Sequence, residues 1–148
     1  MKALTLTQPW ATLVAIGAKR IETRSWGTAY RGVLAIHAAK SFPKEARAFT
    51  VDPVCYEMVR AYAGRNYLLG VAYPLGVVLA IARLVSVERI SKFSRERILL
   101  NGGPCERDLG NYSAGRFAWI LDSVDSLPYP EPARGALGLW EWNREGLW

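Results

Sequence analysis

The chain has 148 residues, of which 51% are hydrophobic and 22% are charged, and its formal net charge is +6. This composition excludes a disordered or low-complexity chain, and the length suits one domain that buries about two-thirds of its unfolded surface. The excess of arginine favours an anionic partner such as nucleic acid, while a basic solvated surface is the alternative that charge alone leaves open.

The supply of metal-binding side chains is small. The 2 cysteines, Cys55 and Cys105, lie far apart in the sequence, and His37 is the only histidine. We therefore expect reduced thiols, no metal site and no cofactor. The N-terminus lacks the pattern of a signal peptide, and no apolar run reaches membrane-spanning length. These features predict a cytoplasmic protein without membrane association.

The first part of the chain predicts a strand, a short helix and a second strand. Residues 3–7 alternate apolar and polar side chains, as a half-buried strand does. Thr7 is the expected N-cap of the helix that follows, with Pro9 in its first turn and Gly17 as a left-handed residue at its end. Residues 19–26 predict a strand with an unusual content of lysine, glutamate and arginine. This composition indicates one side of a polar cleft.

The rest of the chain predicts further strands with helices between them. Asp52 and Pro53 begin the clearest helix, as N-cap and first helical residue. The other expected elements are a glycine-bounded loop at 27–32, strands at 33–39, 76–90, 116–121 and 139–142, a short helix at 94–100, a loop at 102–115 that is long enough to bind a ligand, and a proline-rich stretch at 128–132. Strands with inserted helices and an aromatic C-terminal strand indicate a small mixed barrel.

Several segments resemble one known family. QPWA, GAKRIETRSW and YRGVLAIHAAK stand in the first part of the chain, and NYSAGRFAWIL and RGALGLWEW stand near its end. Together they are similar to the ASCH domain, a branch of the PUA-like superfamily. The resemblance implies a single ASCH domain over residues 1–148, of the α+β class, with a PUA-like mixed β-barrel and flanking helices. It also implies a cleft beside the G-x-K-x-x-E-x-R segment at residues 17–24.

The resemblance implies a function that involves RNA, because members of the wider superfamily bind or modify RNA or act on modified bases. We expect an RNA- or nucleotide-binding domain whose cleft contains Lys19, Glu22 and Arg24. The expected partner is RNA, another single-stranded nucleic acid or a nucleoside-like small molecule. The alternative is a metal-independent hydrolase at the same cleft, since some ASCH-like proteins are ribonucleases and one branch comprises amidohydrolases of acetylated cytidine. An interaction module that uses only the basic surface is a third hypothesis.

The charged strand itself allows two interpretations. Lys19 can polarise a carbonyl or a phosphate, and Glu22 can orient water or move a proton, so these are the catalytic candidates if the protein is an enzyme. The structural interpretation is a Glu22–Arg24 ion pair that fixes the strand, with Lys19 solvated. In the amidohydrolase branch the position three after the lysine is a nucleophilic threonine. Here that position is Glu22, so water activated by Glu22 takes the place of a covalent mechanism.

Further candidates for binding nucleic acid lie around the charged strand. Trp26 is the expected stacking residue, because an aromatic face accepts any base. Trp10 also suits a core position on the first helix, and His37 on its apolar strand suits a satisfied core or rim residue. The remaining nucleic-acid or ligand-binding candidates are Gln8, Trp10, Tyr30, Arg31, Lys40 and Arg116.

Overall fold

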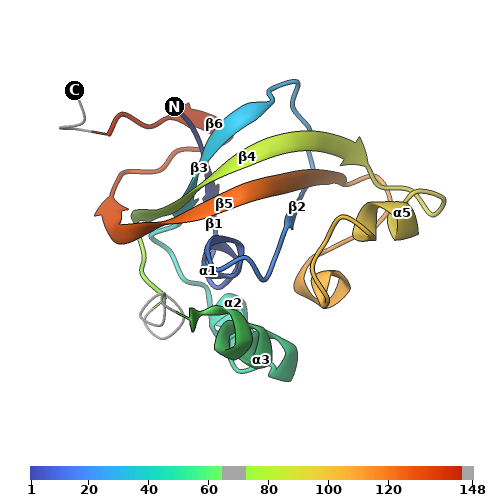
Figure 1. Cartoon of the computed structure of the whole chain (residues 1–148), viewed down its shortest axis with the longest axis horizontal. Helices are drawn as coiled ribbons and strands as arrows, with labels where there is room; N and C mark the ends of the chain where they lie inside the picture. The colour runs from blue at the N-terminus through green and yellow to red at the C-terminus, as the bar shows by residue number, and fades with distance from the viewer. Residues whose placement is uncertain (65–72, 145–148) are drawn as a thin grey trace.

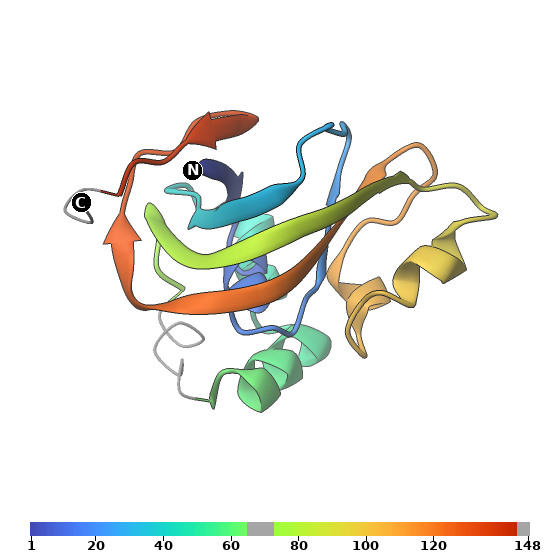
Figure 2. The same ribbon diagram turned by 45° about the horizontal axis from the view of Figure 1, so that its top comes forward.

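The computed structural model describes residues 1–64 and 73–144, which form a curled sheet with helices packed against it (Figures 1 and 2). The strands are β1 (Lys2–Leu6), β2 (Ile21–Arg24), β3 (Gly32–Ala38), β4 (Val77–Arg89), β5 (Phe117–Pro132) and β6 (Leu139–Glu141). The helices are α1 (Trp10–Ala15), α2 (Lys44–Phe49), α3 (Pro53–Tyr62) and α5 (Arg95–Leu99), with a 3-10 helix η2 (Glu106–Leu109).

The sheet has the strand order β2-β5-β4-β3-β1-β6. β1 and β3 run parallel, whereas the other neighbouring pairs are antiparallel. The pairing of β4 with β5 shifts register at three places, between Val78 and Ala80, Ile81 and Arg83, and Leu84 and Ser86. Such irregularities bend a strand and increase its twist, so the sheet curls into a half-barrel. This α+β arrangement confirms the fold class that the resemblance implied.

α1 lies in the hollow of the half-barrel and supplies part of its core. Ala11, Val14 and Ala15 of α1 pack in one cluster with buried side chains from β1, β3, β4 and β5, among them Trp119. The spacing of Trp10, Leu13 and Val14 predicted a helix with one side toward the core, whereas the structure buries every residue from Ala11 to Ala15. The core of the half-barrel therefore orders the segment that joins β1 to β2.

The ends of two helices show which capping predictions held. Asp52 accepts a hydrogen bond from the Val54 amide (2.9 Å) at the start of α3, as predicted. At α1 the prediction of Thr7 as N-cap was wrong, because Pro9 is in that position and the side-chain oxygen Oε1 of Gln8 accepts from the Thr12 amide (3.0 Å). Gly17 has the predicted left-handed φ of +85°, which lets the chain turn from α1 toward β2.

Two elements differ from the prediction. β5 does not end at residue 121 but continues through the proline-rich stretch to Pro132. Beyond Leu121 it has β4 on one side only, since β2 pairs with residues Phe117 to Ile120, and a strand edge tolerates the missing N–H of proline. α2 was not predicted, because its six residues carry no long apolar stripe.

Both cysteines are free thiols, as expected, and Cys55 is buried against α1 and η2 residues while Cys105 is half-buried. No helix within residues 1–64 and 73–144 has the length and apolar character needed to span a membrane.

Candidate functional site

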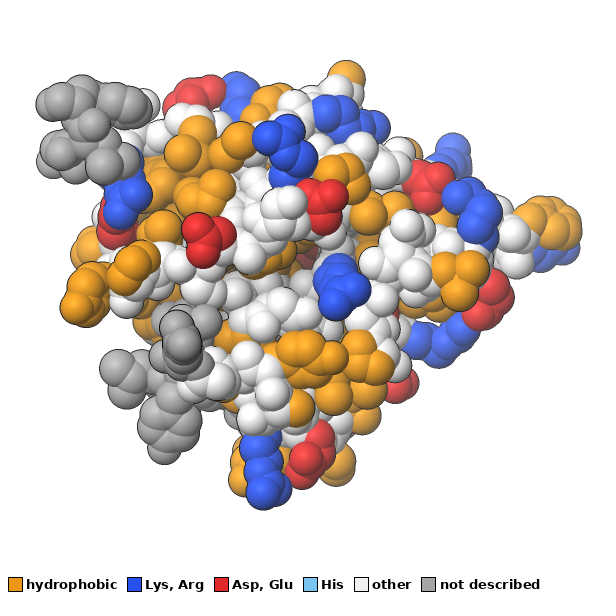
Figure 3. Space-filling view, in the orientation of Figure 1, with side chains coloured by type: hydrophobic (Ala, Val, Ile, Leu, Met, Phe, Trp, Pro, Cys, Tyr) orange, Lys and Arg blue, Asp and Glu red, His pale blue; other side chains and the backbone are white. Residues whose placement is uncertain are grey.

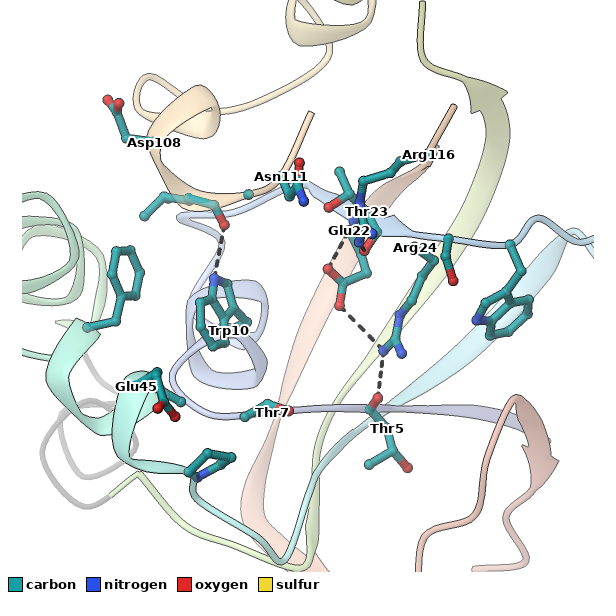
Figure 4. Close-up of a pocket in the computed structure, with 17 residues that line it drawn as sticks. Thr5, Thr7, Trp10, Glu22, Thr23, Arg24, Glu45, Asp108, Asn111 and Arg116 are labelled. Atoms are coloured by element: carbon teal, nitrogen blue, oxygen red, sulfur yellow. Dashed lines mark hydrogen bonds and ion pairs between the residues drawn. The ribbon is translucent and has the colours of Figure 1, made fainter. Parts of the chain in front are cut away.

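A pocket of about 720 Å³ opens between β1 and β2, where the curled sheet is not closed (Figure 4). These strands are joined through α1 in the sequence but are not neighbours in the sheet. The walls come from the ends of both strands, from α1 and α2, and from the segment around η2. The lining residues are Thr5, Thr7, Trp10, Glu22, Thr23, Arg24, Ser25, Trp26, Pro43, Glu45, Ala46, Phe49, Asp108, Leu109, Gly110, Asn111 and Arg116.

Glu22 and Arg24 both face this pocket, as the two-residue period of a strand predicted. Arg24 Nη2 lies 3.5 Å from Glu22 Oε2 and donates to the carbonyl of Thr5 at 2.6 Å. Glu22 Oε1 accepts from the amide of Thr23 at 2.9 Å. The Arg24 side chain therefore bridges from β2 to β1 beside the Glu22 carboxylate (Figure 4).

Arg24 and Arg116 line the pocket with guanidinium groups that are only partly paired. Arg116, directly before β5, donates from Nη2 to the carbonyl of Thr23 at 3.1 Å, which holds its guanidinium beside β2. The Nε atoms of Arg24 and Arg116 are buried and have no hydrogen-bond partner within the described ranges. Leaving a buried donor unpaired costs about 1–3 kcal/mol, so each guanidinium is held beside the pocket at a cost to stability.

Two tryptophans line the pocket from different elements. Trp10 of α1 donates from Nε1 to the carbonyl of Leu109 (3.0 Å) and stacks on Phe49, with ring centroids 5.3 Å apart and an interplanar angle of 8°. Trp26, two residues after β2, packs edge-on against Trp119 at 4.8 Å and 83°. Both Trp10 and Trp26 are half-buried, so protein contacts fix each ring while part of it stays accessible.

The charges that line the pocket nearly cancel. The acidic lining residues are Glu22, Glu45 and Asp108, and the basic ones are Arg24 and Arg116. A polyanionic backbone gains little from such a wall, whereas an uncharged base finds carboxylate acceptors and guanidinium donors together. On the face shown in Figure 3, Lys and Arg side chains are spread among acidic and apolar ones and do not form one basic patch.

Lys19 does not line the pocket, so its predicted place at the cleft mouth is wrong, and so is the alternative of a solvated side chain. Lys19 is 0% exposed. Its Nζ donates to the carbonyl of Ile21 and lies 3.5 Å from Glu106 Oε1. A β-carbon on Gly110 would lie 3.4 Å from Nζ. The ammonium group therefore lies directly behind the part of the pocket wall that Gly110 forms.

Glu106 of η2 joins this wall to the start of β2. Its buried carboxylate accepts from the amides of Arg20 (3.0 Å), Ile21 (2.8 Å) and Gly103 (3.0 Å). The Tyr112 hydroxyl lies 3.4 Å from Glu106 Oε1, and burial together with this carboxylate raises the pKa of Tyr112. Sequence reasoning missed Glu106, because nothing in the local sequence distinguishes it from a surface glutamate.

The other predicted site residues lie away from the pocket. Gln8 is buried and its side chain donates to the carbonyl of Pro74 at 2.9 Å. Tyr30 donates to the Val33 carbonyl, Arg31 is exposed, and Lys40 lines a different cavity. The predicted residues that the structure does bring together around the pocket are Trp10, Glu22, Arg24, Trp26 and Arg116.

Two further segments complete the pocket. The loop at 102–115 was expected to be a binding loop, and its residues Asp108 to Asn111 do line one wall. α2 contributes Glu45, Ala46 and Phe49, which no sequence motif indicated. Within the described residues no group of three or more His, Cys, Asp or Glu side chains is arranged to hold a metal ion.

The comparisons with known proteins agree with this architecture. The model of the ASCH domain family matches residues 4–126, which include all of β2 and the part of β1 that borders the pocket. The chain is also similar to activating signal cointegrator 1 of Mus musculus and of Homo sapiens, with 26% identity over 138 residues in each case. These alignments cover 93% of this chain but 22% of each relative, so the chain spans about a fifth of their length. Since the family match covers most of the sequence, the chain belongs to the ASCH domain family.

Proposed function

We propose that this ASCH domain binds single-stranded RNA and that the pocket between β1 and β2 receives one of its bases. The observation that carries the proposal is the Glu22–Arg24 pair on the pocket wall, whose Oε2 and Nη2 atoms lie 3.5 Å apart. The edge of a base presents donors and acceptors side by side, so a carboxylate next to a guanidinium can pair with it. Membership of the ASCH family supports a nucleic acid as the partner.

The pocket suits a base that has left its stack. Sequence-specific RNA recognition targets unstacked bases of single strands, which lie on aromatic side chains and pair through their edges. Trp10 and Trp26 provide half-buried aromatic surfaces in the pocket, and Arg116 adds a guanidinium beside β2. Stacking on an aromatic ring contributes about 1–3 kcal/mol per base.

The hydrolase alternative has no comparable support. It was built on Lys19 and Glu22 acting together in the cleft, whereas Lys19 is fully buried and bound to Ile21 and Glu106. Glu22 in turn is held by the Thr23 amide and by Arg24. We therefore propose binding without turnover.

The proposal is tested by fluorescence anisotropy with a labelled single-stranded RNA of mixed sequence. Arg116→Ala removes a pocket cation and is expected to weaken binding by about tenfold, the equivalent of one charge-assisted hydrogen bond. Arg31→Ala is the matched control, because Arg31 is an exposed arginine that does not line the pocket. Thermal unfolding of both variants verifies that they are folded.

The proposal requires that the two variants differ in their affinity for RNA. Equal affinity of Arg116→Ala and Arg31→Ala for RNA would remove the pocket from the binding site. Electrophoresis of the same RNA after prolonged incubation tests for turnover. Shortened RNA that appears with wild type and not with Glu22→Gln would favour the hydrolase instead.

A further inference from the structure

A second pocket, of about 1010 Å³, adjoins the first one at β1. Thr5 lines both pockets. Its carbonyl accepts from Arg24 in the first pocket, and its hydroxyl oxygen lies 3.0 Å from His37 Nδ1 in the second. The two cavities are thus separated by little more than one residue of β1.

The second pocket differs from the nearly neutral first one in its charge. Its lining contains the cations Lys40 and Arg134 and neither aspartate nor glutamate. Within residues 1–64 and 73–144 the Lys40 and Arg134 side chains have no ion pair or hydrogen bond, so both cations can meet a ligand without first leaving a carboxylate. Two unpaired cations around a cavity without an acidic neighbour favour an anion.

The Arg134 side of this pocket is fixed by a hydrogen-bond chain through His37. The Ala133 carbonyl, 2.8 Å from His37 Nε2, can only accept, so Nε2 carries the hydrogen and Nδ1 accepts from the Thr5 hydroxyl. Thr5 Oγ1 in turn accepts from Trp140 Nε1 at 3.0 Å. All hydrogen-bonding groups of the neutral imidazole are therefore used to hold the loop in place, and the positive charge of the pocket comes from Lys40 and Arg134.

The loop that follows Ala133 lies directly on these residues. A β-carbon on Gly135 would come within 2.7 Å of His37 Cε1 and 2.8 Å of Thr5 Oγ1, so the loop can approach this closely only with glycine there. The backbone amides of Arg134 to Leu137 donate no hydrogen bond to other described residues. Leu137 is 99% exposed. The backbone at Ala133 and Gly135 is thus held against His37 and Thr5, and the amides of Arg134 to Leu137, beside the pocket, have no described acceptor.

We infer that the second pocket is a phosphate subsite for the same RNA strand whose base enters the first pocket. The inference rests on the proposed function and extends it from a base to the backbone beside it. The first pocket offers hydrogen bonds and aromatic surface but almost no net charge, whereas the second offers charge. Because Thr5 borders both pockets, an RNA strand that crosses β1 can place a base in the first pocket and the neighbouring phosphate in the second.

RNA titrations over a range of salt concentrations test this subsite. The variant Lys40→Ala/Arg134→Ala is compared with the control Arg31→Ala/Lys92→Ala, which removes two exposed cations that line neither pocket. We expect about a tenfold loss of affinity for the first variant, and a slope of log affinity against log salt that is smaller by about 1. Leu137→Glu places a carboxylate at the mouth of the pocket and should weaken RNA binding without affecting the fold.

Inorganic phosphate provides a second measurement that does not depend on RNA. In amide NMR spectra of the wild type, phosphate should shift the resonances of Gly76, Gly135 and Ala136, and these shifts should be absent in Lys40→Ala/Arg134→Ala. Suppose that the double variant has the affinity and the salt dependence of the wild type while Arg116→Ala binds RNA more weakly. The phosphate subsite would then be refuted, and the base-binding role of the first pocket would remain. Phosphate-dependent shifts in a wild type that binds no RNA would reveal a site for free phosphate, which overturns both the RNA subsite and the proposed function.

Discussion

Arg24 donates to the carbonyl of Thr5 at 2.6 Å and so joins β2 to β1, two strands that three others separate in the sheet. The same guanidinium is 3.5 Å from Glu22. Arg24 therefore sets the width of the pocket as well as part of its polarity. A planar fork of donors can serve both partners at once, which a single ammonium group on a flexible stem does less well.

Arg24→Lys tests this dual role. The variant keeps the charge but loses the fork, so we expect the free energy of unfolding to fall by about 1–2 kcal/mol and RNA affinity to fall as well. Urea unfolding measures the first effect and anisotropy the second. Arg83→Lys, at an exposed arginine of β4 that lies outside the pocket and has no described side-chain hydrogen bond, should change neither quantity. Wild-type values for Arg24→Lys would show that the bridge to Thr5 contributes nothing.

Lys19→Met should destabilise the fold strongly. The substitution leaves the Glu106 carboxylate buried without its cation, and loss of one partner of a buried pair costs about 3–5 kcal/mol. Chemical unfolding should show this loss, and Lys19→Met/Glu106→Gln should recover part of it because the buried charge is then gone. Arg31→Met, at an exposed site, is the control. A Lys19→Met variant of unchanged stability would contradict the structural role of this residue.

Trp26→Ala should affect both binding and stability. Loss of a stacked base lowers RNA affinity by about 1–3 kcal/mol, and loss of the edge-on contact with Trp119 removes about 0.5–1.5 kcal/mol of stability beyond the buried area. Phe93→Ala removes an aromatic ring that is 86% exposed and outside the pocket, so it should alter neither. If Trp26→Ala lost stability but kept full affinity for RNA, Trp26 would be a core residue and not a stacking one.

The stability of the protein should depend on pH through His37. Burial lowers the pKa of His37 below 6.5, and the hydrogen bond to the Ala133 carbonyl offsets part of this effect. Between the lowered folded pKa and 6.5 the unfolded chain binds more protons than the folded one, so stability rises with pH in this window. The contribution of His37 is present in full above 6.5 and is lost as the pH falls toward the folded pKa.

His37→Gln separates this effect from the titration of carboxylates. Urea unfolding is measured for the wild type and the variant from about pH 5.5 to 7.5, a range that spans the titration of an ordinary histidine. The free energy of unfolding should rise more steeply with pH in the wild type than in the variant. Parallel profiles would show that protonation of His37 does not oppose folding.

The loop after Ala133 provides a matched pair of glycine substitutions. Gly135→Ala places a β-carbon 2.7 Å from His37 Cε1 and should displace the loop, whereas Gly138, with a φ of +67° and open space around it, should suffer only backbone strain. We expect Gly138→Ala to lose about 1 kcal/mol of stability and Gly135→Ala to lose more, together with phosphate binding in the second pocket. Equal losses for the two variants would contradict the close contact with His37.

The sequence predicted local features of this fold well, because those features depend on neighbours in the chain. The left-handed turn at Gly17, the capping of α3 by Asp52 and the shared face of Glu22 and Arg24 all follow from backbone geometry and strand periodicity. The resemblance to a family supplied the overall fold class. The continuation of β5 through its prolines was missed, since proline normally argues against a strand unless the strand lies at an edge.

The rest of the site depends on contacts between residues far apart in the sequence. Lys19 looks like a surface residue of a charged strand, and only the approach of Glu106, 87 positions away, makes it a buried ion-pair partner. The stacking of Phe49 on Trp10 likewise brings an unpredicted helix to the pocket. No local pattern reveals such pairings, because the two partners belong to elements that are distant in the sequence and meet only in the tertiary structure.

The overhang of β5 past the end of β2 has one more consequence. Beyond Leu121 the strand has no neighbour on the β2 side of the described sheet, and unprotected strand edges are templates for aggregation. Pro128, Pro130 and Pro132 place a residue without an N–H at every second position over the last five residues of this overhang. A second chain that approached the edge would find too few donors to form a continuous ladder. The prolines thus remove donors from the end of this edge, where other copies of the protein could otherwise pair with it.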